Sequence, residues 1–433
     1  MNLRNLRLIF PLVGILICQT FSAQEKKPLN SPVLIPLSRM QEFHQRGGLP
    51  NVFNKIAGQR QVRIGYIGGS ITESANGWRD LTFGWFRSTY PRTAFYQINA
   101  AIGGTGSGLG VFRLDNDLLS EKPDLIFVEF AVNGTGVPPH NAREPMIRTM
   151  EGIVRKTWAK YPNTDICFVY TTALNVCNDL VKGIQTKSVE FMEEVAEHYG
   201  IPTIHMGIEV ARLMSQGKLV FKADPSENAN TIVFTRDGTH PLAESGHPIY
   251  ASTVISHLSK MRKKAASVKH ILPEPLMKDN WQNSKMLDIS KTELTGIWTK
   301  LQADHELLQK FQQFMPSIYQ AKPGSGLKFK FKGTFLGIYD CVGPGTGVIE
   351  LSVDGQKEEI FRFDQWCNNY RKHNFFLKEL DNTVHNVEIT VLNKPIDKAN
   401  IMLKKNITIT DPAKYAGLDW YPANIMIVGE IIK

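Results

Sequence analysis

Short apolar runs alternate with stretches of helical periodicity between residues 61 and 261, and no other feature constrains the fold as strongly. The apolar runs cover residues 61–67, 95–98, 125–130, 166–171 and 201–205, and the helical stretches cover 78–90, 111–119, 146–161, 189–199 and 247–261. Strands and helices that alternate in this way form βαβ units, whose helices cover both faces of a parallel sheet. The sequence therefore predicts an α/β domain with a parallel sheet between helical layers.

The pattern changes beyond about residue 285. Short runs of strand character follow one another at 333–339, 347–353, 359–363, 375–380, 385–392 and 425–432. Asp354-Gly355 is a hairpin signal between two of them, and Pro273 and Pro275 indicate a linker. We therefore predict a second, all-β domain of the sandwich or jelly-roll type. Two domains also suit a chain of 433 residues, which is long for a single core.

The N-terminus has the pattern of a secretory signal peptide. Arg4 and Arg7 precede an apolar run over residues 8–18, and the small residue Ala23 marks the expected cleavage site. The apolar run is too short to span a bilayer, and no other stretch has that character. A lipoprotein anchored through Cys18 is disfavoured, because a small residue normally precedes such a cysteine. We therefore expect a secreted or periplasmic protein without an integral membrane segment.

The predicted organisation follows from these observations. It comprises a signal peptide (1–23), an irregular lead-in (24–59), the α/β domain (60–265), a linker (266–285) and the all-β domain (286–433).

The charge and the cysteines exclude some classes of function. The net charge of +9 comes from 50 basic and 41 acidic residues, without a concentrated basic patch interleaved with aromatic residues. Such a charge indicates a solvated basic surface and no nucleic-acid partner. Cys167, Cys177, Cys341 and Cys367 permit two disulfides but are too sparse for a disulfide framework, and no pair has metal-ligand spacing. Cys167 lies in an apolar run, so we expect a buried free thiol there.

Ser70 is the candidate nucleophile. It follows Gly68 and Gly69 at the predicted carboxyl end of the first strand, the edge at which parallel α/β sheets carry their active sites. Two glycines allow a sharp turn, and a helix beginning next offers backbone N–H groups to a developing negative charge. Taken alone, the same residues also fit a simple strand-to-helix turn with a serine cap.

Asp237 and His240 are the candidate partners of Ser70. A serine hydroxyl needs a base, and a histidine base needs a carboxylate that orients its ring. The two residues lie three apart in Asp-Gly-Thr-His-Pro, a turn-forming sequence. His247 and His257 compete for the role of base, but neither has an aspartate at this spacing.

Donors for an oxyanion follow the second and third strands. The turn at Gly103 and Gly104 offers a backbone N–H, and Asn133 offers a side-chain amide. Asn99 and Asn116 are alternatives, although Asn116 falls within a predicted helix.

Together these motifs resemble the four blocks of the SGNH (GDSL-like) hydrolase superfamily, over residues 60–262. The blocks stand here as Gly68-Gly69-Ser70-Ile71-Thr72, 99–104, Glu129-Phe130-Ala131-Val132-Asn133-Gly134 and 237–241. The resemblance implies a three-layer, flavodoxin-like domain and serine esterase chemistry that requires no metal or other cofactor. It also implies a role for each matching residue. Ser70 is the nucleophile, His240 the general base and acid, and Asp237 the residue that orients His240. Ser70, Gly104 and Asn133 form the oxyanion hole, with Gly103 as the alternative to Gly104.

Two positions depart from the usual blocks. Gly134 stands where the third block usually has an aspartate, which puts the stability of that loop in question. Gly69 stands where many members have an aspartate before the serine, although Gly-Gly-Ser-Ile-Thr is similar to sequences of bacterial esterases.

The domain arrangement resembles that of bacterial secreted carbohydrate acetylesterases. This resemblance implies an acetylated polysaccharide or oligosaccharide as the substrate. Trp366, Tyr370, Trp420 and Tyr421 are aromatic residues able to stack on sugar rings, with Trp366 and Tyr370 as the candidate substrate-binding pair. The same rings also fit the core of the all-β domain. Two other functions stay open: a lipase or thioesterase acting on other acyl groups, and a non-catalytic glycan-binding protein that retains the fold.

Overall fold

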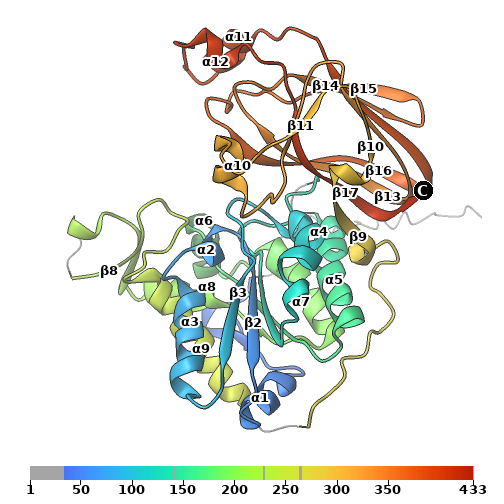
Figure 1. Cartoon of the computed structure of the whole chain (residues 1–433). Coiled ribbons are helices and arrows are strands. Elements are labelled where there is room, and N and C mark those ends of the chain that lie inside the picture. Colours follow the sequence, from blue (N-terminus) through green and yellow to red (C-terminus); the bar gives the residue numbers. More distant parts are fainter. Residues whose placement is uncertain (1–33, 140–141, 228–229, 263–265, 433) are drawn as a thin grey trace, which may run out of the picture. The chain divides into compact units, whose positions relative to one another are not determined.

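A computed structural model describes residues 34–139, 142–227, 230–262 and 266–432 (Figure 1). Residues 35–433 form one compact unit. The predicted signal peptide, with Ala23 and Cys18, lies outside the described residues.

The first region is built on a six-stranded sheet. Its strand order is β1-β6-β5-β4-β2-β3, and all neighbours are parallel except β1 and β6. The strands are β1 (Phe43–His44), β2 (Val62–Gly68), β3 (Phe95–Asn99), β4 (Leu125–Glu129), β5 (Asp165–Val169) and β6 (Thr203–Ile204). Counted along the chain, the parallel strands have the order 2-1-3-4-5 of flavodoxin-like folds. The predicted flavodoxin-like sheet is thus confirmed.

Helices cover both faces of this sheet, as Figure 1 shows. One face packs on α4 (Ser107–Asp117), α5 (Arg143–Lys160) and α7 (Lys187–Tyr199). The other packs on α1 (Pro50–Ala57), α3 (Trp78–Thr89), α6 (Leu174–Val181), α8 (Met206–Ser215) and α9 (Gly246–Met261). Successive strand residues alternate between the two cores, with Phe127 on one face and Val128 on the other. The three-layer prediction is therefore confirmed.

The described part of the lead-in, residues 34–59, contains regular structure that its prolines did not lead us to expect. Strand β1 extends the sheet at its edge, and Pro50 opens α1, a position where its missing N–H costs nothing. Val52, Phe53 and Ile56 of α1 are buried against the sheet. Helices α6 and α8 were not predicted from the sequence, nor was the parallel pair of β7 (Leu219–Lys222) and β8 (Ile232–Thr235).

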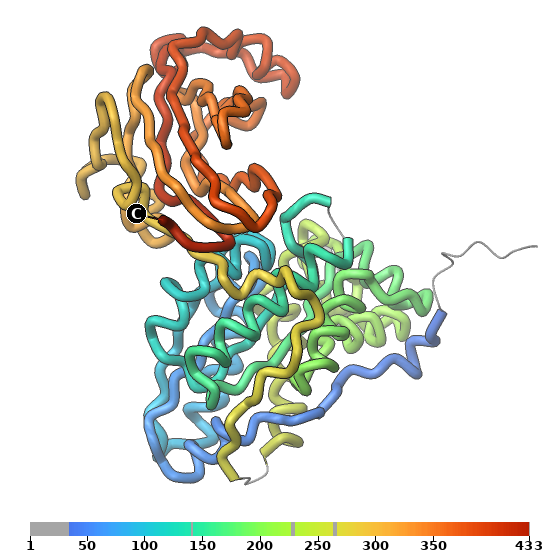
Figure 2. The backbone as a smooth tube through the Cα atoms, turned by 90° about the vertical axis from the view of Figure 1, so that its right-hand side faces the viewer, coloured from blue at the N-terminus to red at the C-terminus, as the bar shows by residue number. Residues whose placement is uncertain are grey.

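The second region is all-β, as predicted. Its seven-stranded sheet has the antiparallel order β15-β14-β16-β13-β17-β9, with β10 also paired to β13. Figure 2 shows the long strands running side by side. The strands are β9 (Ser284–Asp288), β10 (Glu293–Thr295), β13 (Gly326–Val342), β14 (Val348–Val353), β15 (Gln356–Phe361), β16 (Arg371–Leu392) and β17 (Tyr421–Ile432). A small sheet of β11 (Trp298–Lys300) and β12 (Tyr319–Ala321) shares its core. The runs expected at 375–380 and 385–392 form one strand, β16.

One cluster of aromatic residues belongs to both regions. Phe112 on α4 lies 5.2 Å from Trp281 and 5.9 Å from Phe335 on β13, measured between ring centroids. Phe376 on β16 joins the same cluster, at 5.9 Å from Phe335. Because the two sheets share this core, the domain limits of 60–265 and 286–433 stay a prediction.

Two further expectations concern the thiols and the membrane. Cys167, Cys177, Cys341 and Cys367 are free and buried, so the free thiol expected at Cys167 is confirmed. No helix within the described ranges has both the length and the apolar character needed to cross a bilayer.

Candidate active site

Ser70 begins the short helix α2 (Ser70–Glu73) directly after β2. The two glycines before it are required by close approach and not by backbone angle. A Cβ on Gly68 would lie 2.7 Å from the carbonyl oxygen of Glu129, and one on Gly69 would lie 2.1 Å from Oδ1 of Asn133. Gly69 itself has φ −92°, which any residue adopts. The glycines therefore bring the turn of Ser70 against the turn that follows β4.

Ser70, His240 and Asp237 form a hydrogen-bonded chain. The Ser70 Oγ lies 2.8 Å from Nε2 of His240, and Nδ1 of His240 lies 2.6 Å from Oδ2 of Asp237. The other carboxylate oxygen, Oδ1, accepts hydrogen bonds of 2.8 Å from the amides of Thr239 and His240. The aspartate is thus fixed from both sides while it holds the imidazole ring.

The ionised state of Asp237 determines which nitrogen of the His240 ring carries the proton. Partial burial alone would raise the pKa of Asp237, but the hydrogen bonds from the His240 ring and from the amides of His240 and Thr239 outweigh it and lower the pKa to about 2. The ionised carboxylate requires a proton on Nδ1, so a neutral ring turns its lone pair at Nε2 toward Ser70. The side chains of His240 and Asp237 are 53% and 54% exposed, so a substrate has access to them.

The turn that carries this pair is anchored through Gly238. Its amide donates to Oγ1 of Thr235 at 2.8 Å, and its carbonyl accepts from the amide of Leu174 at 2.9 Å. Gly238 has φ +92°, in the region that favours glycine.

The competing histidines are buried and engaged elsewhere. Nδ1 of His247 accepts a hydrogen bond of 3.1 Å from the amide of Trp78, and burial lowers the pKa of His247 to about 4. Nε2 of His257 lies 2.7 Å from Oε1 of Glu42. Of the three histidines considered, His240 is the one that faces Ser70.

The turn after β3 separates its two candidate amides. The amide of Gly103 donates to Oε2 of Glu73 at 2.7 Å, so this N–H is engaged by a carboxylate. Gly104 is exposed, with φ +72°. This geometry favours Gly104 over Gly103 as the donor to an oxyanion.

Asn133 is the asparagine that lies beside the Ser70 turn, because its side chain occupies the space next to Gly69. Oδ1 of Asn99 instead accepts from the amide of Ala101 at 3.2 Å, and Asn116 is exposed on α4. The arrangement favours Asn133 among the three candidates.

Gly134 has a conformational reason to be glycine. Its φ is +61°, its amide donates to the carbonyl of Phe130 at 2.8 Å, and its carbonyl accepts from the amide of Ser107 at 3.0 Å. The loop after β4 is therefore held by backbone hydrogen bonds, without the aspartate that the resemblance led us to expect.

Two residues around α2 support the site but were not predicted from the sequence. Glu73 joins the Ser70 helix to the Gly103 turn, because its carboxylate accepts the hydrogen bond from the Gly103 amide. The buried guanidinium of Arg79 donates to the last carbonyls of that helix, those of Thr72 at 3.0 Å and of Glu73 and Ser74 at 3.3 Å. These carbonyls lack partners within a helix of one turn, so Arg79 satisfies them.

The aromatic candidates have different environments. Trp366 is 54% exposed, with the Lys405 ammonium 4.1 Å from its ring centroid. Tyr370 is half-buried: its ring lies 5.4 Å from that of Tyr421, and its hydroxyl accepts from the amide of Gly345 at 3.2 Å. Trp420 and Tyr421 are buried, so both belong to the interior. Trp366 is thus the most accessible of the four rings.

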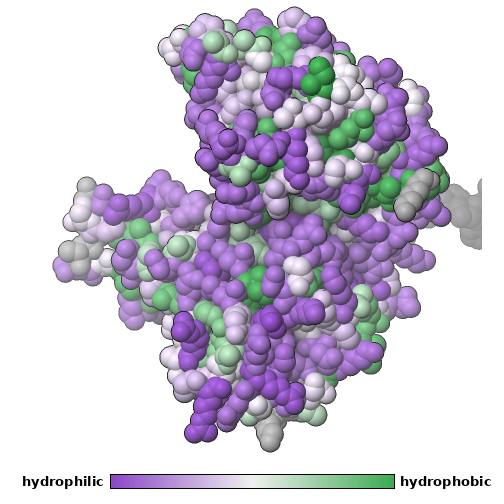
Figure 3. Space-filling view, in the orientation of Figure 1, coloured by the Kyte–Doolittle hydropathy of each residue, from purple (hydrophilic) through white to green (hydrophobic). Residues whose placement is uncertain are grey.

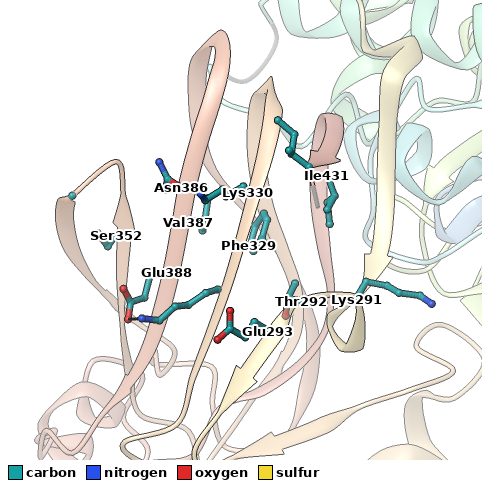
Figure 4. A pocket seen from close by; sticks show the side chains of 13 residues that line it. Lys291, Thr292, Glu293, Phe329, Lys330, Ser352, Asn386, Val387, Glu388 and Ile431 are labelled. Atoms are coloured by element: carbon teal, nitrogen blue, oxygen red, sulfur yellow. Dashed lines mark ion pairs between the residues drawn. The ribbon is translucent and has the colours of Figure 1, made fainter.

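A hollow of about 620 Å³ lies away from these residues, on the all-β sheet (Figure 4). Its lining includes Lys328 paired with Glu388 at 3.0 Å, and its aromatic residue Phe329 is only 8% exposed. The hollow therefore offers no open ring for a sugar to stack on. The view in Figure 3 is mostly hydrophilic, with scattered apolar residues.

Within the part of the chain that the structure describes, no group of three or more His, Cys, Asp or Glu residues is placed to hold a metal ion.

No family model and no curated protein matches the sequence. The structure is similar to crystal structures of a two-domain esterase (CEX) active on acetylated mannans. The TM-score is 0.69 at 21% identity for one of them, and 0.68 at 20% identity for another that was co-crystallized with mannopentaose. Each alignment covers 90% of this chain and 98% of the other. This likeness shows that the protein has the fold of a two-domain esterase, with an α/β region followed by an all-β region.

Proposed function

We propose that this protein is a serine esterase that removes acetyl groups from carbohydrates through an acyl-enzyme. The observation that carries the proposal is the chain from Ser70 Oγ through His240 to Asp237, with links of 2.8 and 2.6 Å. Ser70 follows the carboxyl end of β2, which neighbours β4 at the point where the strand order reverses. Active sites of open α/β sheets occur at such a point.

Acylation begins when His240 takes the proton of the Ser70 hydroxyl and Ser70 Oγ attacks the acetyl carbonyl carbon. The carbonyl oxygen becomes an oxyanion, which accepts hydrogen bonds from the backbone amides of Ser70 and Gly104 and from the side-chain amide of Asn133. The protonated His240 then gives its proton to the departing sugar oxygen as the ester bond breaks. Asp237 stabilises the imidazolium throughout.

Deacylation repeats the same proton transfers with water. His240 takes a proton from a water molecule, whose oxygen attacks the acetyl carbon bound to Ser70. Collapse of the second oxyanion returns a proton to Ser70 and releases acetate. Each step uses residues of this chain alone.

The substrate class rests on the likeness to the esterase active on acetylated mannans and on the openness of the site. The exposed ring of Trp366 is the surface we assign to glycan contact, and the half-buried Tyr370 is the weaker candidate. Export through the predicted signal peptide places the enzyme where such glycans occur.

The alternative functions differ in what they need. An unsupported loop at Gly134 would favour a non-catalytic glycan-binding protein, but backbone hydrogen bonds of Gly134 hold that loop. A lipase or thioesterase requires a preference for longer acyl chains. A clear preference for butyrate or longer esters over acetate esters would favour a lipase or thioesterase and contradict the proposed function.

The test is turnover of p-nitrophenyl acetate, followed by acetate release from acetylated mannan, xylan and their oligosaccharides. We expect Ser70→Ala and His240→Ala to lower kcat by about four orders of magnitude or more. Ser74→Ala is the matched control, because among the described residues its hydroxyl makes one weak hydrogen bond, to the carbonyl of Ala75 at 3.5 Å. Wild-type rates in Ser70→Ala would contradict the proposal.

A further inference from the structure

Glu129 is a fully buried carboxylate directly beneath the proposed catalytic groups. It is the last residue of β4, it is 1% exposed, and it pairs in register with Gly68 of β2. Asn133 lies four residues after it and Ser70 two residues after Gly68. The proposed mechanism uses neither its charge nor its oxygens.

Its two oxygens bind three different segments. Oε1 accepts hydrogen bonds from the amide of Ala131 at 3.1 Å and from the hydroxyl of Thr171 at 2.6 Å. Oε2 accepts from the hydroxyl of Thr72 at 3.2 Å. Thr72 belongs to the Ser70 helix, Ala131 to the loop of Asn133, and Thr171 to the segment after β5.

Hydrogen bonds are the main compensation for burying this group. Burial raises the pKa of Glu129, and the largest opposing contributions are the bonds from Thr171, Thr72 and the amides of Ala131 and Val132. A buried carboxylate without an ionic partner is expensive, and an apolar residue would fill the same space at lower cost. Its presence therefore calls for a role beyond packing.

We propose that Glu129 is a positioning residue that fixes the Ser70 turn and the Asn133 loop relative to each other. Through Thr72 it sets where the nucleophile helix begins, and through Ala131 it sets where the asparagine side chain projects. The inference rests on the proposed function, in which the Ser70 amide and Asn133 bind the same oxyanion. Displacing such donors by about an ångström weakens the binding of the transition state more than the binding of the substrate.

The primary test is Glu129→Gln, which keeps the shape but turns one acceptor oxygen into a donor. We expect kcat for p-nitrophenyl acetate to fall about 10- to 100-fold, with KM within about threefold of wild type, less than removal of an oxyanion donor costs. Thr72→Val removes only the hydroxyl that joins Glu129 to the Ser70 helix, and we expect a fall of about fivefold. If Glu129 acts on Ser70 through Thr72, the double variant will fall short of the product of the two effects.

Thr171→Val is the matched control. It removes a hydrogen bond to the same carboxylate, but Thr171 carries none of the proposed catalytic groups. We expect the melting temperature of Thr171→Val to fall about as much as that of Thr72→Val, while its kcat stays within about twofold of wild type. A purely structural role predicts equal effects of the two threonine variants on kcat.

The outcomes separate the two proposals. If wild type is active and Ser70→Ala is not, but Glu129→Gln keeps wild-type kcat, the positioning role is wrong and the esterase stands. Equal kcat losses in Thr72→Val and Thr171→Val also overturn the positioning role. If wild type neither hydrolyses esters nor reacts at Ser70 with a fluorophosphonate probe, the esterase proposal fails and the positioning role fails with it.

Discussion

Each region has an Asp–His pair in which the histidine Nδ1 meets the carboxylate, and the two pairs have nearly equal geometry. In the α/β region, His240 Nδ1 lies 2.6 Å from Asp237, and in the all-β region, His385 Nδ1 lies 2.7 Å from Asp354. The pairs differ in what meets the second ring nitrogen. Nε2 of His240 faces the Ser70 hydroxyl, whereas Nε2 of His385 lies 2.8 Å from the carbonyl oxygen of Asp381.

We propose that this difference separates a catalytic base, His240, from a structural contact, His385. A carbonyl oxygen accepts hydrogen bonds only, so it favours a proton on His385 Nε2 and a charged ring. Burial alone would lower the pKa of His385, but the bonds to Asp354 and to the Asp381 carbonyl outweigh it and raise the pKa. A hydroxyl can donate to Nε2 of His240, so that nitrogen can serve as the proton acceptor of the proposed mechanism. On this proposal, the third partner decides which Asp–His pair is catalytic.

The largest expected effect comes from replacing each aspartate in turn. Asp237→Asn places an amide against His240 Nδ1 and reverses the favoured tautomer, so kcat should fall about 10³- to 10⁴-fold. Asp354→Asn makes the same chemical change in the other pair and should leave kcat within about twofold. Esterase assays on both variants check this. A large loss of activity in Asp354→Asn, or none in Asp237→Asn, would break the comparison.

A smaller effect is expected when the Ser–His–Asp chain is kept and only a neighbouring donor moves. A Cβ on Gly69 would lie 2.1 Å from Oδ1 of Asn133, so Gly69→Ala displaces that side chain while φ at this position accommodates alanine. We expect kcat to fall about 10- to 100-fold. Gly84→Ala is the matched control, because a Cβ there meets nothing within 4 Å. Unchanged kcat in Gly69→Ala would remove Asn133 from the proposed oxyanion hole.

The smallest expected effect is a pH-dependent stability difference at the second pair. The raised pKa of His385 contributes stability below its unfolded value of about 6.5, and this stability is lost as pH rises through the folded pKa. The lowered pKa of Asp354 contributes stability above about pH 4. Asp354→Asn should therefore melt about 1–3 °C below wild type between about pH 4 and 6.5, and nearly level with it at about pH 9. Melting curves at these pH values check the sign, and a difference that grows toward alkaline pH would contradict it.

The contrast between local and distant partners also explains what the sequence could predict. Asp237 and His240 are three residues apart on one turn, so their contact is visible in the sequence. Asp354 and His385 meet because strand pairing brings the β14–β15 turn beside β16. The separation of the two residues in the sequence does not indicate this contact. The alternating strands and helices from β2 to β6 were largely predictable because each has its own periodicity, whereas α6 and α8 were not predicted.

The supports of the site were not predictable for the same reason. The bonds from Glu129 to Thr72 and Thr171 join three strand ends that are distant in the chain. The engagement of the Gly103 amide by Glu73 depends on where two turns meet in space. Buried polar residues of this kind have no pattern of their own, and the sequence shows them only as polar residues at the ends of apolar runs.

The aromatic cluster shared by the two sheets has a consequence for how such proteins are engineered. Phe112 and Trp281 lie under Phe335 and Phe376, and a Cβ on Gly108 at the start of α4 would lie 3.0 Å from the Phe376 ring. Cutting the chain between the two sheets would expose these rings to water. The loops near Asn133 would lose the side chains that pack against them. The all-β region is therefore not a separable module, and exchanging it for a different domain means redesigning one continuous interior.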